Sequence, residues 1–230
     1  RVTMLGASAI LFPHPVKELE IAKEYGTLVY DASHVLGLVA GGEFQQPLKE
    51  GADVMIGSTH KTFPGPQGGL ALTNSEEKAE MLGEMLLFDF DRGIGLVDNP
   101  HANRIAALGI VLEEMLAHGK EYASQIVRNA RKLASALHEM GMPVKFQEKG
   151  FTRSHQVLLD MSPGDAEEFC GRMENQGIFI DISGRIGVAE ATHMGMKERE
   201  MDEIARMIAD AHRGKDVRAE VKRMADEFYR

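Results

Sequence analysis

The sequence predicts an α/β fold in which a mostly parallel sheet is followed by a smaller α+β part. Short apolar runs at 2–5, 27–30 and 52–56 have the length and β-branched content of buried strands. A stretch with helical spacing at 15–25 separates the first two runs, and Gly26 follows it as a stop signal. Strand, helix and strand in this order indicate a βαβ unit with a right-handed crossover.

Later elements follow from the same signals. We expect a strand at 69–73 and then a helix at 75–87, capped by Ser75, with Met81, Met85 and Leu86 packed in the core. Helical patterns at 102–117 and 119–140 surround the expected domain change. The predicted domains are therefore residues 1–117 and residues 118–230. In the second domain we expect strands at 144–146, 155–160 and 178–182, and helices at 162–176, 197–211 and 215–229.

Composition limits the classes of function. The 230 residues carry a net charge of −9, which argues against a nucleic-acid partner because phosphates would repel the chain. No apolar run reaches the ~20 residues of a membrane span. The single Cys170 excludes an internal disulfide and favours a reducing cytoplasm. The histidines are scattered, so we predict no metal site.

Chemically active side chains follow the predicted strands. Lys61 lies just beyond the strand at 52–56, in a turn closed by a Gly/Pro cluster. A lone lysine at a strand end is in most proteins a solvated charge. Here, however, the strand at 27–30 ends in Asp31 and His34, and Ser8 follows the strand at 2–5. Ligands of open α/β sheets bind beyond the carboxyl ends of the strands, so these side chains form a candidate site.

Three motifs carry a resemblance to a known family. They are DASHVLGL at 31–38, THKT at 59–62 and GPQGG at 65–69, and they resemble serine hydroxymethyltransferases. The resemblance runs from about 8 to 196. It implies a fold-type I transferase that depends on pyridoxal 5'-phosphate. On the same basis we expect an N-terminally truncated chain, since it begins directly on a strand.

The resemblance implies a role for each candidate residue. Lys61 supplies the Schiff-base amine, Asp31 the acid for the pyridine nitrogen, and His34 a contact with the ring or its phenolic oxygen. Arg185 binds the substrate carboxylate, for which a guanidinium has matching geometry. The resemblance also implies cofactor contacts from Ser8, Ser58 and His60. Two alternatives stay open, a plain turn serine for Ser8 and a structural salt bridge for Arg185.

The implied reaction is the interconversion of serine and glycine with a tetrahydropterin one-carbon carrier. It places the protein among transferases of one-carbon and amino-acid metabolism, as a cytoplasmic homodimer. Gln67 stands where relatives have arginine, and Asp98-Asn99 and Val188-Ala189 also depart from the family pattern, so we expect a divergent member. Two alternatives remain: an aldolase or aminotransferase that uses pyridoxal phosphate on another amino acid, and a cofactor-free, non-catalytic scaffold.

Overall fold

The chain divides into two compact units, which are described separately. A computed structural model describes residues 1–229. The first unit comprises Arg1–Ser8 and His14–Gly119, and the second comprises Ala9–Pro13 and the chain from Lys120 onward. Among the described residues, no helix combines the length and the apolar character that a membrane span requires.

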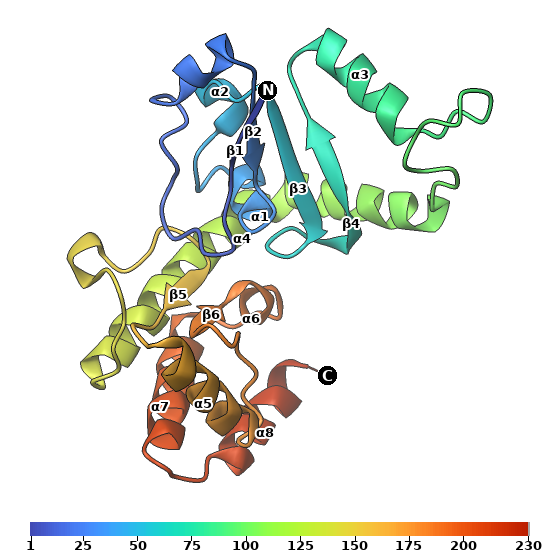
Figure 1. The fold of residues 1–230 in the computed structure, drawn as a ribbon. Helices are drawn as coiled ribbons and strands as arrows, with labels where there is room; N and C mark the ends of the chain where they lie inside the picture. The colour runs from blue at the N-terminus through green and yellow to red at the C-terminus, as the bar shows by residue number, and fades with distance from the viewer. Residues whose placement is uncertain (230) are drawn as a thin grey trace. The chain divides into compact units, whose positions relative to one another are not determined.

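A sheet that is parallel except for its last strand forms the centre of the first unit (Figure 1). Its strand order is β1-β2-β3-β4; β1, β2 and β3 are parallel, and β4 runs antiparallel to β3. The strands are β1 (Val2–Leu5), β2 (Thr27–Asp31), β3 (Val54–His60) and β4 (Pro64–Leu72). The predicted mostly parallel sheet is therefore confirmed.

The connections of this sheet are less helical than the sequence predicts. Between β1 and β2 the only helical turn is the 3-10 segment η1 (Glu20–Glu24), so the helix expected at 15–25 is wrong. Ile21 and Tyr25, two of its apolar positions, are exposed and give no continuous buried face. Between β2 and β3 lie two short helices, α1 (Leu36–Ala40) and α2 (Pro47–Glu50).

The core of the first unit lies under β2 and the segment after it. The side chains of Leu28, Tyr30, Val35 and Leu38 are fully buried there. The hydroxyl of Tyr30 donates to Gln45 Oε1 at 2.8 Å, which satisfies the one polar atom of this ring. Burial raises the pKa of Tyr30, and the nearby carboxylates add to the effect. A buried apolar core whose tyrosine hydroxyl is hydrogen-bonded thus supports the strand that ends at Asp31.

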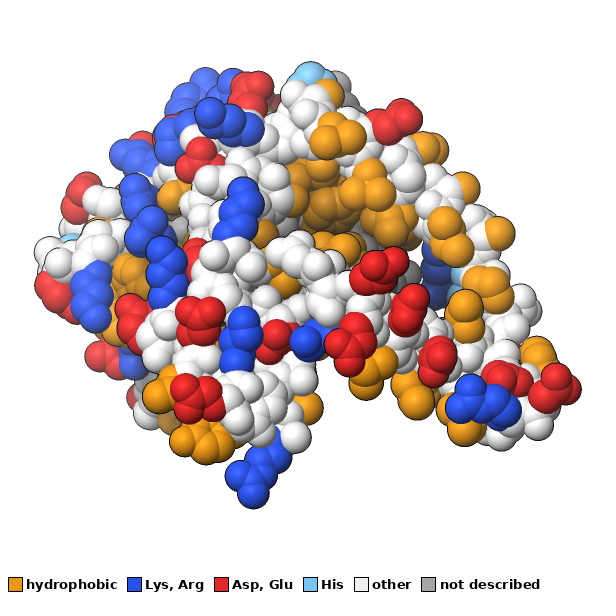
Figure 2. All heavy atoms as spheres, turned by 90° about the horizontal axis from the view of Figure 1, so that it is seen from above, with side chains coloured by type: hydrophobic (Ala, Val, Ile, Leu, Met, Phe, Trp, Pro, Cys, Tyr) orange, Lys and Arg blue, Asp and Glu red, His pale blue; other side chains and the backbone are white. Residues whose placement is uncertain are grey.

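Helix α3 (Glu76–Leu86) begins where predicted but packs differently. Ser75 caps it, accepting a hydrogen bond from the Lys78 N–H at 3.3 Å. Its expected core stripe is wrong, because Met81 and Met85 are 61% and 54% exposed. Further exposed apolar side chains follow on the loop after the helix, and hydrophobic side chains are visible at the surface in Figure 2 (orange). This part of the unit therefore presents an apolar surface.

Helix α4 (Ala102–Glu139) is continuous where two helices were predicted. Gly119 lies inside it, and the Met115 side chain occupies the space beside that glycine. One glycine in a helix interior costs only ~1 kcal/mol relative to alanine, which the rest of the helix offsets. In its second half Ile126, Leu133 and Leu137 are buried in the core of the second unit.

The second unit packs helices around a small antiparallel sheet. Its strands are β5 (Gln156–Leu158) and β6 (Arg185–Gly187). Its later helices are α5 (Pro163–Glu174), α6 (Ala189–His193), α7 (Glu198–His212) and α8 (Arg218–Phe228). Two predicted strands are wrong: 144–146 retains only the bridge from Val144 to Leu159, and 178–182 forms no strand. Phe179 is 80% exposed, so the apolar run at 178–182 does not mark a buried strand.

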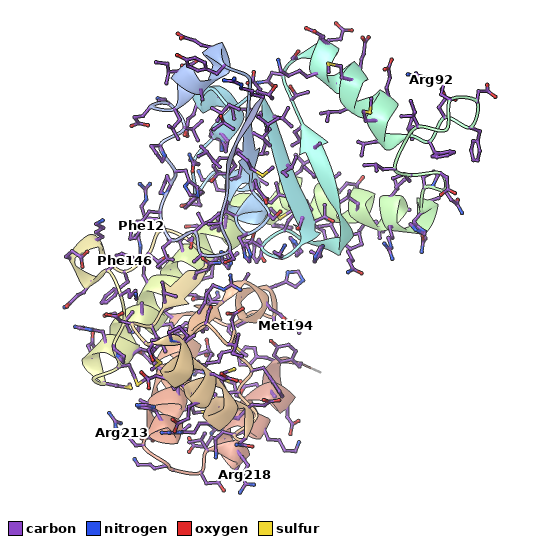
Figure 3. The ribbon with its side chains drawn as sticks, viewed as in Figure 1. Phe12, Arg92, Phe146, Met194, Arg213 and Arg218 are labelled. Carbon is purple, nitrogen blue, oxygen red and sulfur yellow. The ribbon has the colours of Figure 1, made fainter. Side chains whose placement is uncertain are left out.

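The segment Ala9–Pro13 belongs to the second unit although it lies near the start of the chain. The Ile10 N–H donates to Gln156 Oε1 at 2.8 Å, and the Arg153 N–H donates to Leu11 O at 2.8 Å. The rings of Phe12 and Phe146 meet edge to face, with centroids 5.6 Å apart (Figure 3). These contacts join the segment to β5 and to the loop before it.

Candidate active site

The candidate residues of the first unit lie at the carboxyl ends of β1, β2 and β3. Asp31 is the last residue of β2, and Lys61 directly follows β3. The parallel registers pair Leu5 with Tyr30 and Asp31 with Ile56, so the three strands end along one edge of the sheet. Ser8 is exposed on the segment after β1. This edge is where an open α/β sheet binds ligands.

Lys61 is an exposed side chain at the tip of the β3–β4 hairpin. Its Nζ donates to Ser58 Oγ at 2.8 Å, and residues 1–229 place no carboxylate within ion-pair distance of it. The β3–β4 pairing shifts register between Ser58 and His60, which bends the strand end. His60 Nδ1 accepts from the Gly68 N–H at 3.3 Å across the hairpin. Ser58 and His60 therefore hold the hairpin on which the lysine sits.

Thr62 ties this hairpin to the loop that carries His34. Its side chain is fully buried; Oγ1 donates to His34 O at 3.0 Å and accepts from the Gly37 N–H at 3.1 Å. A Cβ at position 37 would lie 2.2 Å from the carbonyl oxygen of Thr62, so only glycine allows this approach. The half-buried His34 is thereby held on a segment bonded to the residue next to Lys61.

Asp31 is half-buried, and only one of its two carboxylate oxygens accepts a hydrogen bond from the described residues. Its Oδ1 accepts from the Ser33 N–H at 2.8 Å, and within the described chain Oδ2 has no donor. A Cβ at position 6 would lie 2.6 Å from the Asp31 Cβ, so Gly6 lets the segment after β1 approach this carboxylate closely. The site thus contains an amine, a carboxylate with an available oxygen, and an imidazole.

Arg185 belongs to the second unit, whereas the other candidate residues belong to the first. It begins β6, is largely buried, and its guanidinium donates to Asp181 Oδ2 at 2.7 Å. Hydrogen bonds from Ser183 and then the charge of Arg185 hold the pKa of Asp181 below its ordinary value. The structural salt bridge that the sequence left open as an alternative is present here.

Sequence reasoning missed three residues that shape the site: Gly6, Ser33 and Gly37. Gly6 could have been noticed because it directly follows a predicted strand. The spacing of Asp31 and Ser33 is typical of a turn in which the carboxylate accepts from the backbone two residues on. Nothing near Gly37 in the sequence indicates its contact with Thr62.

Comparison with known proteins identifies the family. The family model of serine hydroxymethyltransferase matches residues 4–208. The chain is 47% identical to the serine hydroxymethyltransferase of Methanothermobacter thermautotrophicus, over all of this chain and 57% of that protein. It is 45% identical to the serine hydroxymethyltransferase of Pyrococcus furiosus, over 96% of this chain and 57% of that protein.

A solved structure has the same fold. The crystal structure of L-threonine transaldolase from Pseudomonas fluorescens matches 99% of this chain and 54% of its own, with a TM-score of 0.86 and 35% identity. The fold is therefore that of the fold-type I enzymes, as the resemblance implied. The chain spans little more than half the length of each of these relatives. The chain belongs to the serine hydroxymethyltransferase family.

Proposed function

We propose that the protein interconverts serine and glycine, using pyridoxal phosphate and a tetrahydropterin one-carbon carrier. One observation carries the proposal: Lys61, Asp31 and His34 lie on segments that hydrogen bonds join at one edge of a parallel sheet. The family to which the chain belongs supports the choice of reaction. The identity of the one-carbon carrier as a tetrahydropterin is also proposed.

The residues present fit pyridoxal phosphate. The cofactor requires an amine that can be released from its hydrogen bond, and Lys61 donates only to a serine hydroxyl in the described chain. It also requires a carboxylate for its ring nitrogen, and Asp31 Oδ2 has no donor among residues 1–229. When bound, pyridoxal phosphate supplies a sink for the electrons of a bond broken at the substrate's α-carbon.

Each candidate residue has a definite task in this proposal. Lys61 would hold the cofactor through its amine, and before the cofactor binds Ser58 orients that amine by accepting its hydrogen bond. Asp31 keeps a proton on the ring nitrogen, because a carboxylate favours a nearby positive charge. His34 contacts the cofactor from the loop that Thr62 holds in place. Ser8 and His60 are assigned further cofactor contacts.

Arg185 is assigned the carboxylate of the amino-acid substrate. A guanidinium has five N–H donors in a planar fork that matches a carboxylate bidentately. The Asp181 carboxylate accepts a hydrogen bond from one terminal nitrogen of Arg185, which fixes the plane of the guanidinium. In this arrangement Asp181 orients the guanidinium, and Arg185 binds the substrate carboxylate.

We also propose the larger organisation that the family implies. Residues 1–117 form the C-terminal part of the cofactor-binding domain and residues 118–230 form the small domain. The protein acts as a homodimer, which the exposed apolar side chains Met81, Phe90 and Leu96 support, since large exposed apolar areas mark interaction surfaces. We assign it to the cytoplasm because its single cysteine, Cys170, is free.

The test measures glycine formation from serine by the full-length protein loaded with pyridoxal phosphate. We expect a rate that depends on an added tetrahydropterin, and we expect Lys61→Ala to abolish it. Lys49→Ala is the matched control, because Lys49 is an exposed lysine of the same unit outside the site. Glycine formation that survives Lys61→Ala would refute the assignment.

A second candidate is an aldolase or transaldolase reaction on another β-hydroxy amino acid. The specific observation that favours it is the similarity to the L-threonine transaldolase structure. Glycine formation from serine that does not respond to the tetrahydropterin would favour this candidate. Failure of the full-length protein to bind pyridoxal phosphate in a titration would instead favour a non-catalytic scaffold.

A further inference from the structure

A serine side chain extends the hydrogen bonding between β2 and β3 beyond the end of β2. The regular pairing ends with Asp31 opposite Ile56, after which the Ala32 N–H donates to Ile56 O at 2.7 Å. The bonds of a parallel ladder are evenly spaced, so the next N–H of β3 that faces β2 is that of Ser58. It donates to Ser33 Oγ at 3.2 Å.

This contact fixes the residue that holds the candidate lysine. Ser58 accepts the hydrogen bond of Lys61 Nζ through its own hydroxyl, at 2.8 Å. On its other side β3 pairs Ser58 with Gly69 of β4, and the register shifts between Ser58 and His60. The strand end is thus bonded to β4 on one side, and Ser33 provides its anchor on the β2 side.

The same serine contacts the candidate carboxylate. The Ser33 N–H donates to Asp31 Oδ1 at 2.8 Å, and this is a backbone bond that does not depend on the side chain. Ser33 therefore bonds to Asp31 through its backbone and to the lysine-bearing strand through its hydroxyl. Removing the hydroxyl breaks only the second bond, so the two functions of this residue can be separated by mutation.

We propose that Ser33 is a positioning residue that sets the spacing between the Asp31 carboxylate and the Lys61 amine. The inference rests on the proposed function, in which these two groups hold the same cofactor. Ser33 itself acts through Ser58. A hydroxyl at position 33 thus determines how tightly and in what orientation pyridoxal phosphate is held.

The first measurement needs no cofactor. In the full-length protein stripped of pyridoxal phosphate, hydrogen–deuterium exchange is followed on peptides that cover 54–60. Loss of one hydrogen bond in Ser33→Ala raises the exchange rate of the Ser58 amide by about tenfold. Ser33→Thr keeps a hydroxyl and restores slow exchange. Ser75→Ala is the matched control, because Ser75 Oγ also accepts from a backbone N–H, at 3.3 Å, in the same unit.

The second measurement follows cofactor binding and the visible circular dichroism of the bound cofactor. Ser33→Ala weakens the affinity for pyridoxal phosphate by about tenfold and reduces the dichroism, since misplaced binding groups lose orientation. Ser33→Thr retains both properties, and Ser75→Ala changes neither.

The two measurements separate this inference from the proposed function. Unchanged exchange at Ser58 in Ser33→Ala overturns the inference whatever the protein binds. Faster exchange together with unchanged affinity and dichroism also overturns it, because the bond then has only a structural role. If the parent protein does not bind pyridoxal phosphate, the proposed function fails, and the inference fails with it.

Discussion

Replacing Gly37 by alanine tests how closely the two segments of the site approach each other. The new Cβ would lie 2.2 Å from the Thr62 carbonyl oxygen, 2.5 Å from the Thr62 carbonyl carbon and 2.9 Å from the Phe63 nitrogen. All three are backbone atoms, so no side-chain rotation relieves the clash. Reaching ordinary contact at about 3.5 Å from 2.2 Å requires a displacement of about 1.3 Å between the α1 segment and the turn that carries Lys61.

This displacement has two measurable consequences. Overpacking a buried site costs ~1–3 kcal/mol of unfolding free energy, and because the clash here is with backbone atoms we expect a cost of about 2–3 kcal/mol, which exceeds the ~1 kcal/mol that alanine gains over glycine in a helix. A displacement of about 1 Å between catalytic groups reduces kcat/KM by about 100-fold. We expect the loss of stability in urea unfolding and the loss of kcat/KM in the glycine-formation assay, both measured on the full-length protein.

The matched control is Gly83→Ala in helix α3. No atom lies within 4 Å of the Cβ added there, so this variant keeps full activity and gains up to ~1 kcal/mol in stability. The reasoning is refuted if Gly37→Ala has the stability and activity of the parent protein, because the two segments would then not be held at the distance described.

Three further predictions concern other residues. Asp31→Asn keeps an oxygen for the Ser33 N–H and so leaves the urea midpoint nearly unchanged, but without the charge it lowers kcat by about 100-fold; a normal kcat would exclude the proposed role. Asn129→Leu leaves the buried Met196 carbonyl without the Asn129 amide, whereas the Thr192 hydroxyl keeps its bond to Val188 O, so we expect a cost of ~1–3 kcal/mol in urea unfolding; a loss below ~0.5 kcal/mol would contradict this accounting. Asp181 has a lower pKa in the folded than in the unfolded chain, so its stabilisation is complete above its usual value of 3.8 and lost as pH falls below it. Asp181→Asn should therefore flatten the acid side of the stability–pH curve, and an unchanged acid side would argue against the hydrogen bonds from Ser183 and the pairing with Arg185.

The parts of the site that local sequence determines were predictable. The strand before Asp31 lies where its apolar run predicts it, and the strand predicted at 52–56 before Lys61 is also present, although it runs on to His60. The cap at Ser75 follows equally from a local rule. These features depend only on neighbouring residues in the sequence, so the local pattern is sufficient to predict them.

The remainder depends on contacts that the chain order does not reveal. The bond between Gly37 and Thr62 and the bond between Ser33 and Ser58 each join residues 25 positions apart. Tertiary packing also overrides local patterns: α4 continues through Gly119, and the apolar stripe of α3 lies at the surface. Helical spacing shows which residues share a face, but it does not show what covers that face.

The most direct test of the account is to identify the lysine that holds the cofactor. Borohydride reduction of the full-length protein loaded with pyridoxal phosphate makes the link between the cofactor and its lysine permanent, and peptide mass spectrometry then locates it. The account predicts modification of Lys61 and of no other lysine. Modification of a different lysine, or of none, would contradict it.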